Sequence, residues 1–380
     1  MHAALPPEDL DLVLSLTRGF WSRYAGSRLF ITGGTGFIGS WLVQVIQRAN
    51  DKLDSRIELL VLTRDPDRAH QQSPHVFERA DTRLAAGDVS TFAESVGAID
   101  LCIHAAAEVG NPHQADQPLK VFDTIVQGTR RMLDLAQHAG ARRFLLASSG
   151  AVYGPQPTHL ARMPESYGGS PDPLHAANAY SNGKRAAEWL ACAYAAQAAR
   201  TIQPAPSTTS ATSTTCPAPS EPSTGASFSP AIARIFAVLG PGLPLDGPFA
   251  AGNFIRDALL GRSIQINGDG TPLRSYLYTA DLCVWLLRIL ESGSAGQAYN
   301  VGSEHALSIT SLAKRVVGAS GQTVPIRVQT PPDTTHGNLS TRYVPDTSKA
   351  RLALNLAEYT PFDTALRKTM QWTRSTTMAP

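Results

Sequence analysis

The fold class of this chain is decided by the stretch Ile31-Thr32-Gly33-Gly34-Thr35-Gly36-Phe37-Ile38-Gly39. A short β-rich run precedes it, and a helical pattern begins inside it. Gly33 permits a tight turn, Gly36 has no Cβ to keep a pyrophosphate off the backbone, and Gly39 lets helix and strand pack closely. The helix N-terminus then faces the phosphates. The stretch therefore predicts a dinucleotide-binding turn, with cofactor contacts at Gly33, Gly36, Phe37, Ile38 and Gly39.

Short β-rich runs alternate with helical patterns along the first two thirds of the chain. The expected strands cover residues 28–32, 57–62, 83–86, 101–104, 143–148 and 231–236. Such alternation predicts a parallel sheet wound by right-handed crossovers. The expected fold class is therefore α/β, a Rossmann-type doubly wound parallel sheet with a smaller C-terminal α/β substrate lobe.

Four segments follow from the same pattern. Residues 1–27 form an N-terminal helical extension, expected to pack on the outside, and residues 28–200 form the dinucleotide-binding domain with the catalytic residues. Residues 201–229 consist almost wholly of Ser, Thr, Pro and Ala, which predicts a disordered insertion. Residues 230–380 supply the last strand or strands of the sheet and the substrate lobe.

Composition excludes several classes of protein. With 33 basic and 31 acidic residues, the chain has no basic block that would track a nucleic acid backbone. Its acidic start does not resemble a signal peptide, and no long apolar run predicts a membrane span. Its four cysteines lack metal-ligand spacing, so no metal site is expected. We expect a cytoplasmic protein with no membrane partner.

The residues after the second and third strands bear on the choice of cofactor. A carboxylate near the adenosine ribose favours NAD, and a cation favours the 2′-phosphate of NADP. Here Thr63 takes the position of the acid and Arg64 follows it, so NADP is favoured, while Asp65 keeps NAD possible. Further cofactor contacts are expected at Asp88, Val89 and Ala105, whereas His104 is expected to be structural.

Tyr180 and Lys184 form the candidate acid–base pair. Their spacing of four residues places both side chains on one face of a helix. A cation one turn away favours the phenolate, so Tyr180 could exchange a proton with a sugar hydroxyl near neutral pH. Upstream, Ser148-Ser149-Gly150-Ala151-Val152-Tyr153-Gly154 closes the fifth expected strand, where active-site residues of such sheets belong.

Taken in order, these motifs resemble the extended short-chain dehydrogenases/reductases, the NAD-dependent epimerase/dehydratase family of nucleotide-sugar enzymes. The likeness covers about residues 28–373. It implies that Ser149 hydrogen-bonds the reacting sugar oxygen, that Tyr180 is the acid/base, and that Lys184 tunes Tyr180 and holds the nicotinamide ribose. It also implies a homodimer in which helices near residues 119–137 and 179–199 pack against their copies.

The same likeness suggests the substrate contacts. It matches Asn253 and Arg274 to segments that hold a sugar diphosphate, for which the donor fork of arginine is well suited. Ser275 stands where the family usually has an acid. Glu108 follows His104-Ala105-Ala106-Ala107 and is a candidate to face the sugar, the alternative being a solvated loop charge.

The residues after Ser149 bear on the reaction. Dehydratases of the family have an Asp-Glu pair there, and decarboxylases have a Glu at the second position, whereas this chain has Gly150 and Ala151. Hydride transfer at C4, as in a 4-epimerase or 4-keto reductase, is therefore favoured. A 4,6-dehydratase or uronate decarboxylase remains the alternative, and a cofactor-binding sensor or scaffold is the non-enzymatic one.

Overall fold

The computed structural model describes residues 3–107, 116–202, 228–330 and 341–377. Its centre is a seven-stranded sheet in the order β11-β6-β5-β4-β1-β2-β3, in which all neighbouring strands run parallel. This is the doubly wound α/β fold expected from the sequence. The strands are β1 (Arg28–Thr32), β2 (Glu58–Thr63), β3 (Thr82–Ala86), β4 (Leu101–His104), β5 (Arg143–Ser149), β6 (Ser229–Ile235) and β11 (Ala298–Val301).

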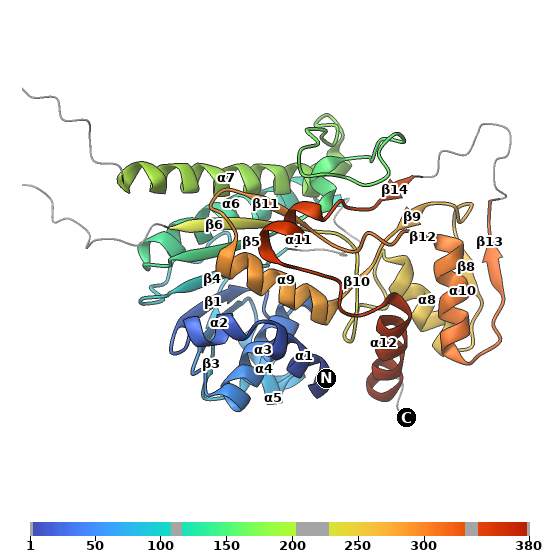
Figure 1. The fold of residues 1–380 in the computed structure, drawn as a ribbon, viewed down its shortest axis with the longest axis horizontal. Coiled ribbons are helices and arrows are strands. Elements are labelled where there is room, and N and C mark those ends of the chain that lie inside the picture. Colours follow the sequence, from blue (N-terminus) through green and yellow to red (C-terminus); the bar gives the residue numbers. More distant parts are fainter. Residues whose placement is uncertain (1–2, 108–115, 203–227, 331–340, 378–380) are drawn as a thin grey trace, which may run out of the picture.

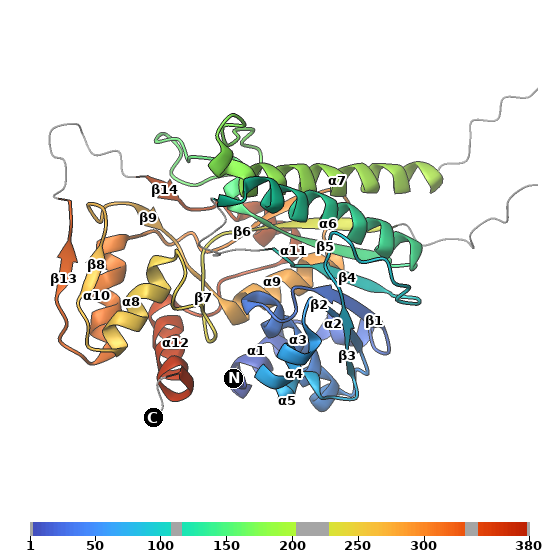
Figure 2. The same cartoon turned by 180° about the vertical axis from the view of Figure 1, so that it is seen from behind.

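Helices cover both faces of this sheet (Figures 1 and 2). Helices α6 (Pro118–His138) and α7 (Ala179–Ile202) lie side by side on one face, and α3 (Phe37–Leu53) and α9 (Thr279–Ser292) lie on the other. Two separate groups of buried apolar side chains fill the spaces between sheet and helices. The N-terminal half of the sheet also carries the short helices α4 (Pro66–Gln72) and α5 (Pro74–Phe77).

Some strands begin or end one or two residues away from the positions expected from the sequence, because of how they pair with their neighbours. Thr63 belongs to β2 because it pairs with Ala86 of β3. Ser149 belongs to β5, and β6 begins at Ser229 because that residue pairs with Arg143. Hydrogen bonds to neighbouring strands set these limits, and a single sequence does not reveal them.

The N-terminal extension packs against helices α3 and α9, and its apolar face joins the core while its polar face stays exposed. It forms α1 (Pro7–Leu16) and α2 (Arg18–Arg23). Val13 and the carboxylate-bearing Asp9 are fully buried. The Asp9 side chain accepts a hydrogen bond from Tyr278 at 2.5 Å and pairs with Lys368. The extension therefore connects the sheet domain with the C-terminal helix α12 (Phe362–Thr377).

Most of the insertion expected at residues 201–229 lies outside the described residues. Helix α7 continues to Ile202, and β6 begins at Ser229. The expected disorder of the segment between them stays a prediction.

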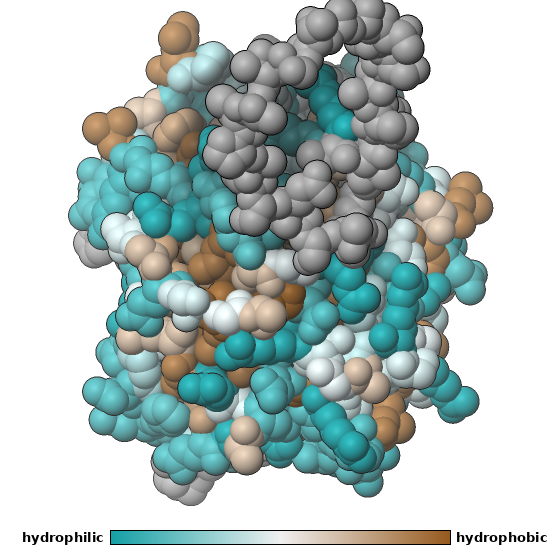
Figure 3. All heavy atoms as spheres, turned by 90° about the vertical axis from the view of Figure 1, so that its left-hand side faces the viewer, coloured by the Kyte–Doolittle hydropathy of each residue, from teal (hydrophilic) through white to brown (hydrophobic). Residues whose placement is uncertain are grey.

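The C-terminal lobe lies beside the carboxyl ends of the strands (Figure 1). Its helices are α8 (Ala250–Leu259), α10 (Ile309–Ser320) and α11 (Ser348–Leu354). Its short strands are β7 (Val238–Leu239), β8 (Ile264–Ile266), β9 (Leu273–Arg274), β10 (Leu277–Tyr278), β12 (Leu307–Ser308), β13 (Ile326–Val328) and β14 (Arg342–Tyr343). The opposite end of the molecule is mainly hydrophilic, with a smaller group of apolar residues near its middle (Figure 3). Within the described ranges, no helix has the length and apolar character needed to cross a bilayer.

Candidate active site

The glycine turn has the close contacts that a phosphate cradle requires. Gly33 adopts a φ of 73°, and a Cβ there would lie 2.7 Å from the backbone of Ala105. A Cβ on Gly39 would lie 2.1 Å from the carbonyl oxygen of Gly33. Gly36 is the N-cap of α3, and a Cβ there would have only that carbonyl oxygen nearby, at 3.3 Å. The turn and the start of a 17-residue helix therefore fit a dinucleotide pyrophosphate.

The charged side chains expected near the cofactor include two carboxylates, Asp65 and Asp88, and the cation Arg64. Asp65 accepts a hydrogen bond from the backbone N–H of Arg68 at 2.9 Å, which makes it the N-cap of α4. Burial raises the pKa of Asp88, but hydrogen bonds from Ser90 and the charges of Arg64 and Lys120 bring it below its usual value. Arg64 therefore acts electrostatically on Asp88, one of the residues expected to contact the cofactor.

His104 lies inside the sheet and bonds to a neighbouring strand. Its Nδ1 lies 2.7 Å from the hydroxyl of Thr32, and the residue is buried. Burial and the charge of Lys184 lower the pKa of His104 to about 3, so its ring is neutral. This geometry agrees with the structural role expected for His104. Ala105, the next residue in the chain, lies against the backbone of Gly33. Val89 is buried and lies next to Gly128 of α6.

Ser149, Tyr180 and Lys184 come together at the carboxyl end of β5. Ser149 ends the strand and begins the 3-10 turn η2 (Gly150–Tyr153), accepting a hydrogen bond from the Ala151 N–H at 3.2 Å. Tyr180 lies in the first turn of α7, and the Lys184 ammonium lies 5.9 Å from the centre of its ring. The spacing of four residues thus places both side chains on the helix face next to Ser149.

Burial changes the protonation of this cluster. It raises the pKa of Tyr180, although a hydrogen bond with Ser149 opposes the shift. It also lowers the pKa of Lys184 to about 8, although the charge of Glu188 opposes the shift. Burial thus brings the pKa of Lys184 closer to neutral pH, whereas it moves the pKa of Tyr180 farther from it.

Tyr343 also belongs to this cluster, and the sequence analysis missed it. Burial raises its pKa, while a hydrogen bond with Ser149 and the charge of Arg274 lower it. A Cβ on Gly150 would lie 2.6 Å from the Tyr343 hydroxyl. The tyrosine thus fills the space where an acidic side chain at position 150 would begin. Tyr343 lies far from Ser149 in the sequence, so no sequence pattern indicates that the two residues are close. The pairing of β14 with β9 brings Tyr343 to the site.

The expected substrate residues lie in the C-terminal lobe. Arg274 pairs with Tyr343 across β9 and β14, and its charge reaches the cluster around Ser149. Asn253 lines a cavity of about 230 Å³, but its amide donates to Gly247 at 3.0 Å. Ser275 is fully buried, and its hydroxyl has no hydrogen-bond partner within the described ranges.

Two further expectations are limited by which residues are described. Glu108 lies outside the described residues. The part of the chain that is described contains no group of three or more His, Cys, Asp or Glu side chains that could hold a metal ion.

Comparisons with known proteins agree with this geometry. The model of the NAD dependent epimerase/dehydratase family matches residues 29–302. UDP-glucuronic acid decarboxylase 6 of Arabidopsis thaliana is 30% identical over 331 residues, which cover 86% of this chain and 83% of the relative. UDP-glucuronic acid decarboxylase 1 of the same plant is also 30% identical, over 86% of this chain and 65% of its own length.

Solved structures share the fold. The dTDP-glucose 4,6-dehydratase DesIV of Streptomyces venezuelae, with NAD and TYD bound, has a TM-score of 0.72 and 24% identity, over 92% of this chain and 97% of its own. The chain spans 56% to 65% of the length of three curated decarboxylases that it matches. The family model covers well over half of the chain, and its match includes the glycine turn, Ser149, Tyr180 and Lys184. The chain therefore belongs to the NAD dependent epimerase/dehydratase family.

Proposed function

We propose that this chain is an NAD(P)-dependent enzyme that transfers a hydride at C4 of a nucleotide-diphosphate sugar. The observation that carries the proposal is the cluster of Ser149, Tyr180 and Lys184 at the carboxyl end of β5. The glycine turn meets the backbone of Ala105 at the end of neighbouring β4. Ligands of doubly wound sheets bind at this edge. Loss of any of the three side chains would be expected of a sensor or scaffold, and all three are present.

The chain's own residues supply binding and proton transfer. Tyr180 accepts the proton of the C4 hydroxyl, Ser149 hydrogen-bonds the same oxygen, and Lys184 favours the phenolate by its charge. A nicotinamide dinucleotide, which the turn with Gly33, Gly36 and Gly39 would hold, would supply the hydride acceptor or donor for C4. Arg274 is proposed to hold the diphosphate, because a guanidinium forms charge-assisted bonds to such an anion. Asn253 and the cavity that it lines are proposed to accept part of the same nucleotide.

The outcome after oxidation at C4 divides the candidate functions. The names of the relatives favour the lyase alternative, decarboxylation or dehydration, over epimerisation or reduction. Dehydration needs an acid and a base near C5 and C6, and neither Gly150 nor Ala151 can supply one. Oxidation of a hexuronate at C4, in contrast, gives a β-keto acid whose ketone itself promotes loss of carbon dioxide. Decarboxylation of a nucleotide uronate is therefore the first candidate.

C4 epimerisation or 4-keto reduction is the second candidate. The absence of a carboxyl group at positions 150 and 151 supports it, together with the contact of Tyr343 against Gly150. These reactions need one acid–base residue, which Tyr180 provides.

Mass spectrometry detects loss of carbon dioxide or water, and chromatographic separation of the nucleotide sugars detects C4 epimers, which have the same mass as the substrate. The purified chain would be given NAD or NADP with UDP-glucuronate, UDP-glucose or dTDP-glucose. Decarboxylation of the uronate predicts a pentose product lighter by one carbon dioxide, whereas C4 chemistry alone keeps every carbon and the C6 oxygen. Loss of water from a hexose would contradict both candidates. The absence of any reaction, with cofactor still bound, would favour the sensor alternative.

For the cofactor, we propose NADP as the preferred form and NAD as possible. Support comes from Arg64, which follows β2, and from Asp65, whose carboxylate is used as a helix cap. A guanidinium beside a 2′-phosphate is worth about 1.5–3 kcal/mol, a preference of about tenfold or more. Arg64→Ala should therefore weaken NADP binding by that factor and leave NAD binding almost unchanged, as measured by calorimetry.

Arg83→Ala is the matched control, because Arg83 is an exposed arginine on the neighbouring strand β3. It should change neither affinity. Equal losses for both cofactors in Arg64→Ala, or tighter binding of NAD by the unmodified chain, would contradict the preference.

A further inference from the structure

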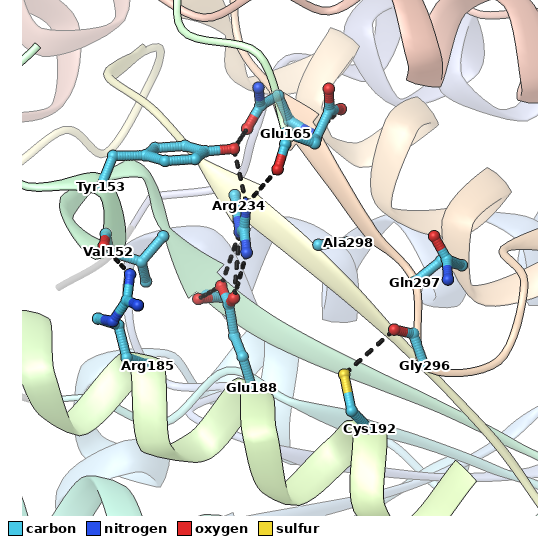
Figure 4. Close-up of polar contacts among 12 residues, drawn as sticks. Val152, Tyr153, Glu165, Arg185, Glu188, Cys192, Arg234, Gly296, Gln297 and Ala298 are labelled. Carbon is cyan, nitrogen blue, oxygen red and sulfur yellow. Dashed lines mark hydrogen bonds and ion pairs between the residues drawn. The ribbon is translucent and has the colours of Figure 1, made fainter. Parts of the chain in front are cut away.

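A buried ion pair lies directly behind the catalytic cluster. Glu188 of α7 and Arg234 of β6 have side chains only 9% and 17% exposed. The guanidinium contacts both carboxylate oxygens, with N–O distances from 2.7 to 3.1 Å. Figure 4 shows Arg234 between Glu188 on one side and the hydroxyl of Tyr153 on the other. No step of the proposed reaction uses either residue.

The carboxylate side of the pair fixes α7 to the strand that carries Ser149. Glu188 follows Lys184 by one helical turn, so both side chains lie on one face of α7. Lys184 donates to the carbonyl oxygen of Ala147 at 2.7 Å, and the hydroxyl of Ser148 donates to Glu188 at 2.5 Å. Two successive residues of β5, directly before Ser149, are therefore held by two successive turns of α7.

The guanidinium side fixes the segment after Ser149. Arg234 donates to the hydroxyl of Tyr153 at 2.8 Å, and this hydroxyl donates to Asn300 of β11 at 2.7 Å. The guanidinium carbon also lies 4.7 Å from the centre of the Tyr153 ring. Tyr153 ends the turn η2 that Ser149 begins. The ion pair thus contacts the chain on both sides of Ser149.

Charge links the same pair to Lys184. Burial lowers the pKa of Lys184 to about 8, and the charge of Glu188 acts in the opposite direction. His104 of β4 faces Lys184 as a neutral ring, because its own pKa is about 3. Several elements with titratable or charged side chains pack against α7 within the described ranges. On α7 itself these are Tyr180, Arg185, Cys192, Tyr194 and Arg200; on its neighbours they are Lys120, Asp123, Arg130, Arg131, Asp134 and His138 of α6, Arg143 of β5, Arg234 of β6 and Tyr153 of η2. Of these, Asp134 and Arg130 interact with Tyr194, farther along α7.

We propose that the Glu188–Arg234 ion pair is a positioning device for the reaction, in which Glu188 keeps Lys184 in its charged form and Arg234 limits how strongly it does so. The two residues do not touch the reacting atoms. The role of the pair in catalysis rests on the proposed function, whereas its effect on the charge of Lys184 does not depend on that function. The proposal has a consequence that simple scaffolding lacks: removing the anion and removing the cation should move the titration of Lys184 in opposite directions.

Lysine NMR tests this directly, because the chain contains only six lysines: Lys52, Lys120, Lys184, Lys314, Lys349 and Lys368. With lysine labelled with carbon-13 at Cε, each signal can be followed through a pH titration, and Lys184→Arg identifies the signal of Lys184. Glu188→Gln should weaken proton binding by Lys184 about tenfold, and Arg234→Gln should strengthen it. Arg234→Lys, which keeps the cation, should stay near the unmodified protein.

Glu291→Gln is the matched control. Glu291 of α9 pairs with Arg288 at 2.6 Å and is similarly buried, but it lies on the opposite face of the sheet. It should leave Lys184 unchanged. The other lysine signals report whether each variant is folded. Shifts in the same direction in Glu188→Gln and Arg234→Gln, or an unmoved Lys184 signal in either, would overturn the proposal.

The titration needs no substrate, so failure of the proposed function would appear separately as absence of turnover. Where a substrate is found, the pH profile gives a second readout. Activity that needs the ammonium of Lys184 is present below its pKa and is lost as the pH rises through it. In Glu188→Gln the alkaline limb of the kcat profile should therefore move about one pH unit lower. If the alkaline limb of the kcat profile stays in place while the midpoint of the Lys184 titration moves, then Lys184 does not control the reaction.

Discussion

Tyr180 is the residue whose replacement tests the proposed chemistry most directly. Tyr180→Phe removes the acid–base group and keeps the ring beside Lys184. We expect kcat to fall by about 10²–10⁴ while KM changes little, because proton transfer acts in the transition state. Tyr167→Phe, which removes a phenol that packs on Tyr153 outside the cluster, is the control and should keep kcat. Unchanged turnover in Tyr180→Phe would exclude it as the acid/base.

Single residues differ in how well the sequence predicts their place. The pair Tyr180 and Lys184 could be predicted because helical geometry places residues four apart on one face. Tyr343 and Arg234 could not, because strand pairing brings them to Ser149 from far along the chain. Gly150 has no carboxyl group. Its contact with Tyr343 gives the physical reason why a larger side chain does not fit there without a shift.

At the scale of elements, local patterns predicted the presence and the parallel direction of the strands better than their ends. The expected strands at 28–32 and 101–104 agree with β1 and β4. β5 and β6 extend further because Ser149 and Ser229 find partners in the sheet. The N-terminal helix shows a different limit. The sequence predicts a helical extension there, but no sequence pattern identifies Tyr278 and Lys368 as partners of Asp9.

At the scale of the whole molecule, α6 and α7 form a paired helical face that faces away from the sheet (Figure 2). Two large apolar side chains are exposed on these helices, Leu119 at 80% and Trp189 at 68%. Each of these side chains would gain from burial against a partner, since covering apolar surface is favourable. A second copy of the chain would cover the same surface on both subunits around a twofold axis, as in most homodimers. We therefore expect a homodimer through α6 and α7.

Light scattering tests this expectation on the purified chain, whose monomer mass is 40.5 kDa. The unmodified protein should have twice that mass at micromolar concentration, and Trp189→Glu should weaken the dimer by at least about tenfold, because it buries a charge at the centre of an apolar contact. Leu352→Glu makes the same kind of change on α11, where Leu352 is 86% exposed, and should leave the mass unchanged. A monomeric unmodified protein would contradict the dimer. Equal dissociation by both variants would show that added charge, rather than loss of this surface, separates the subunits.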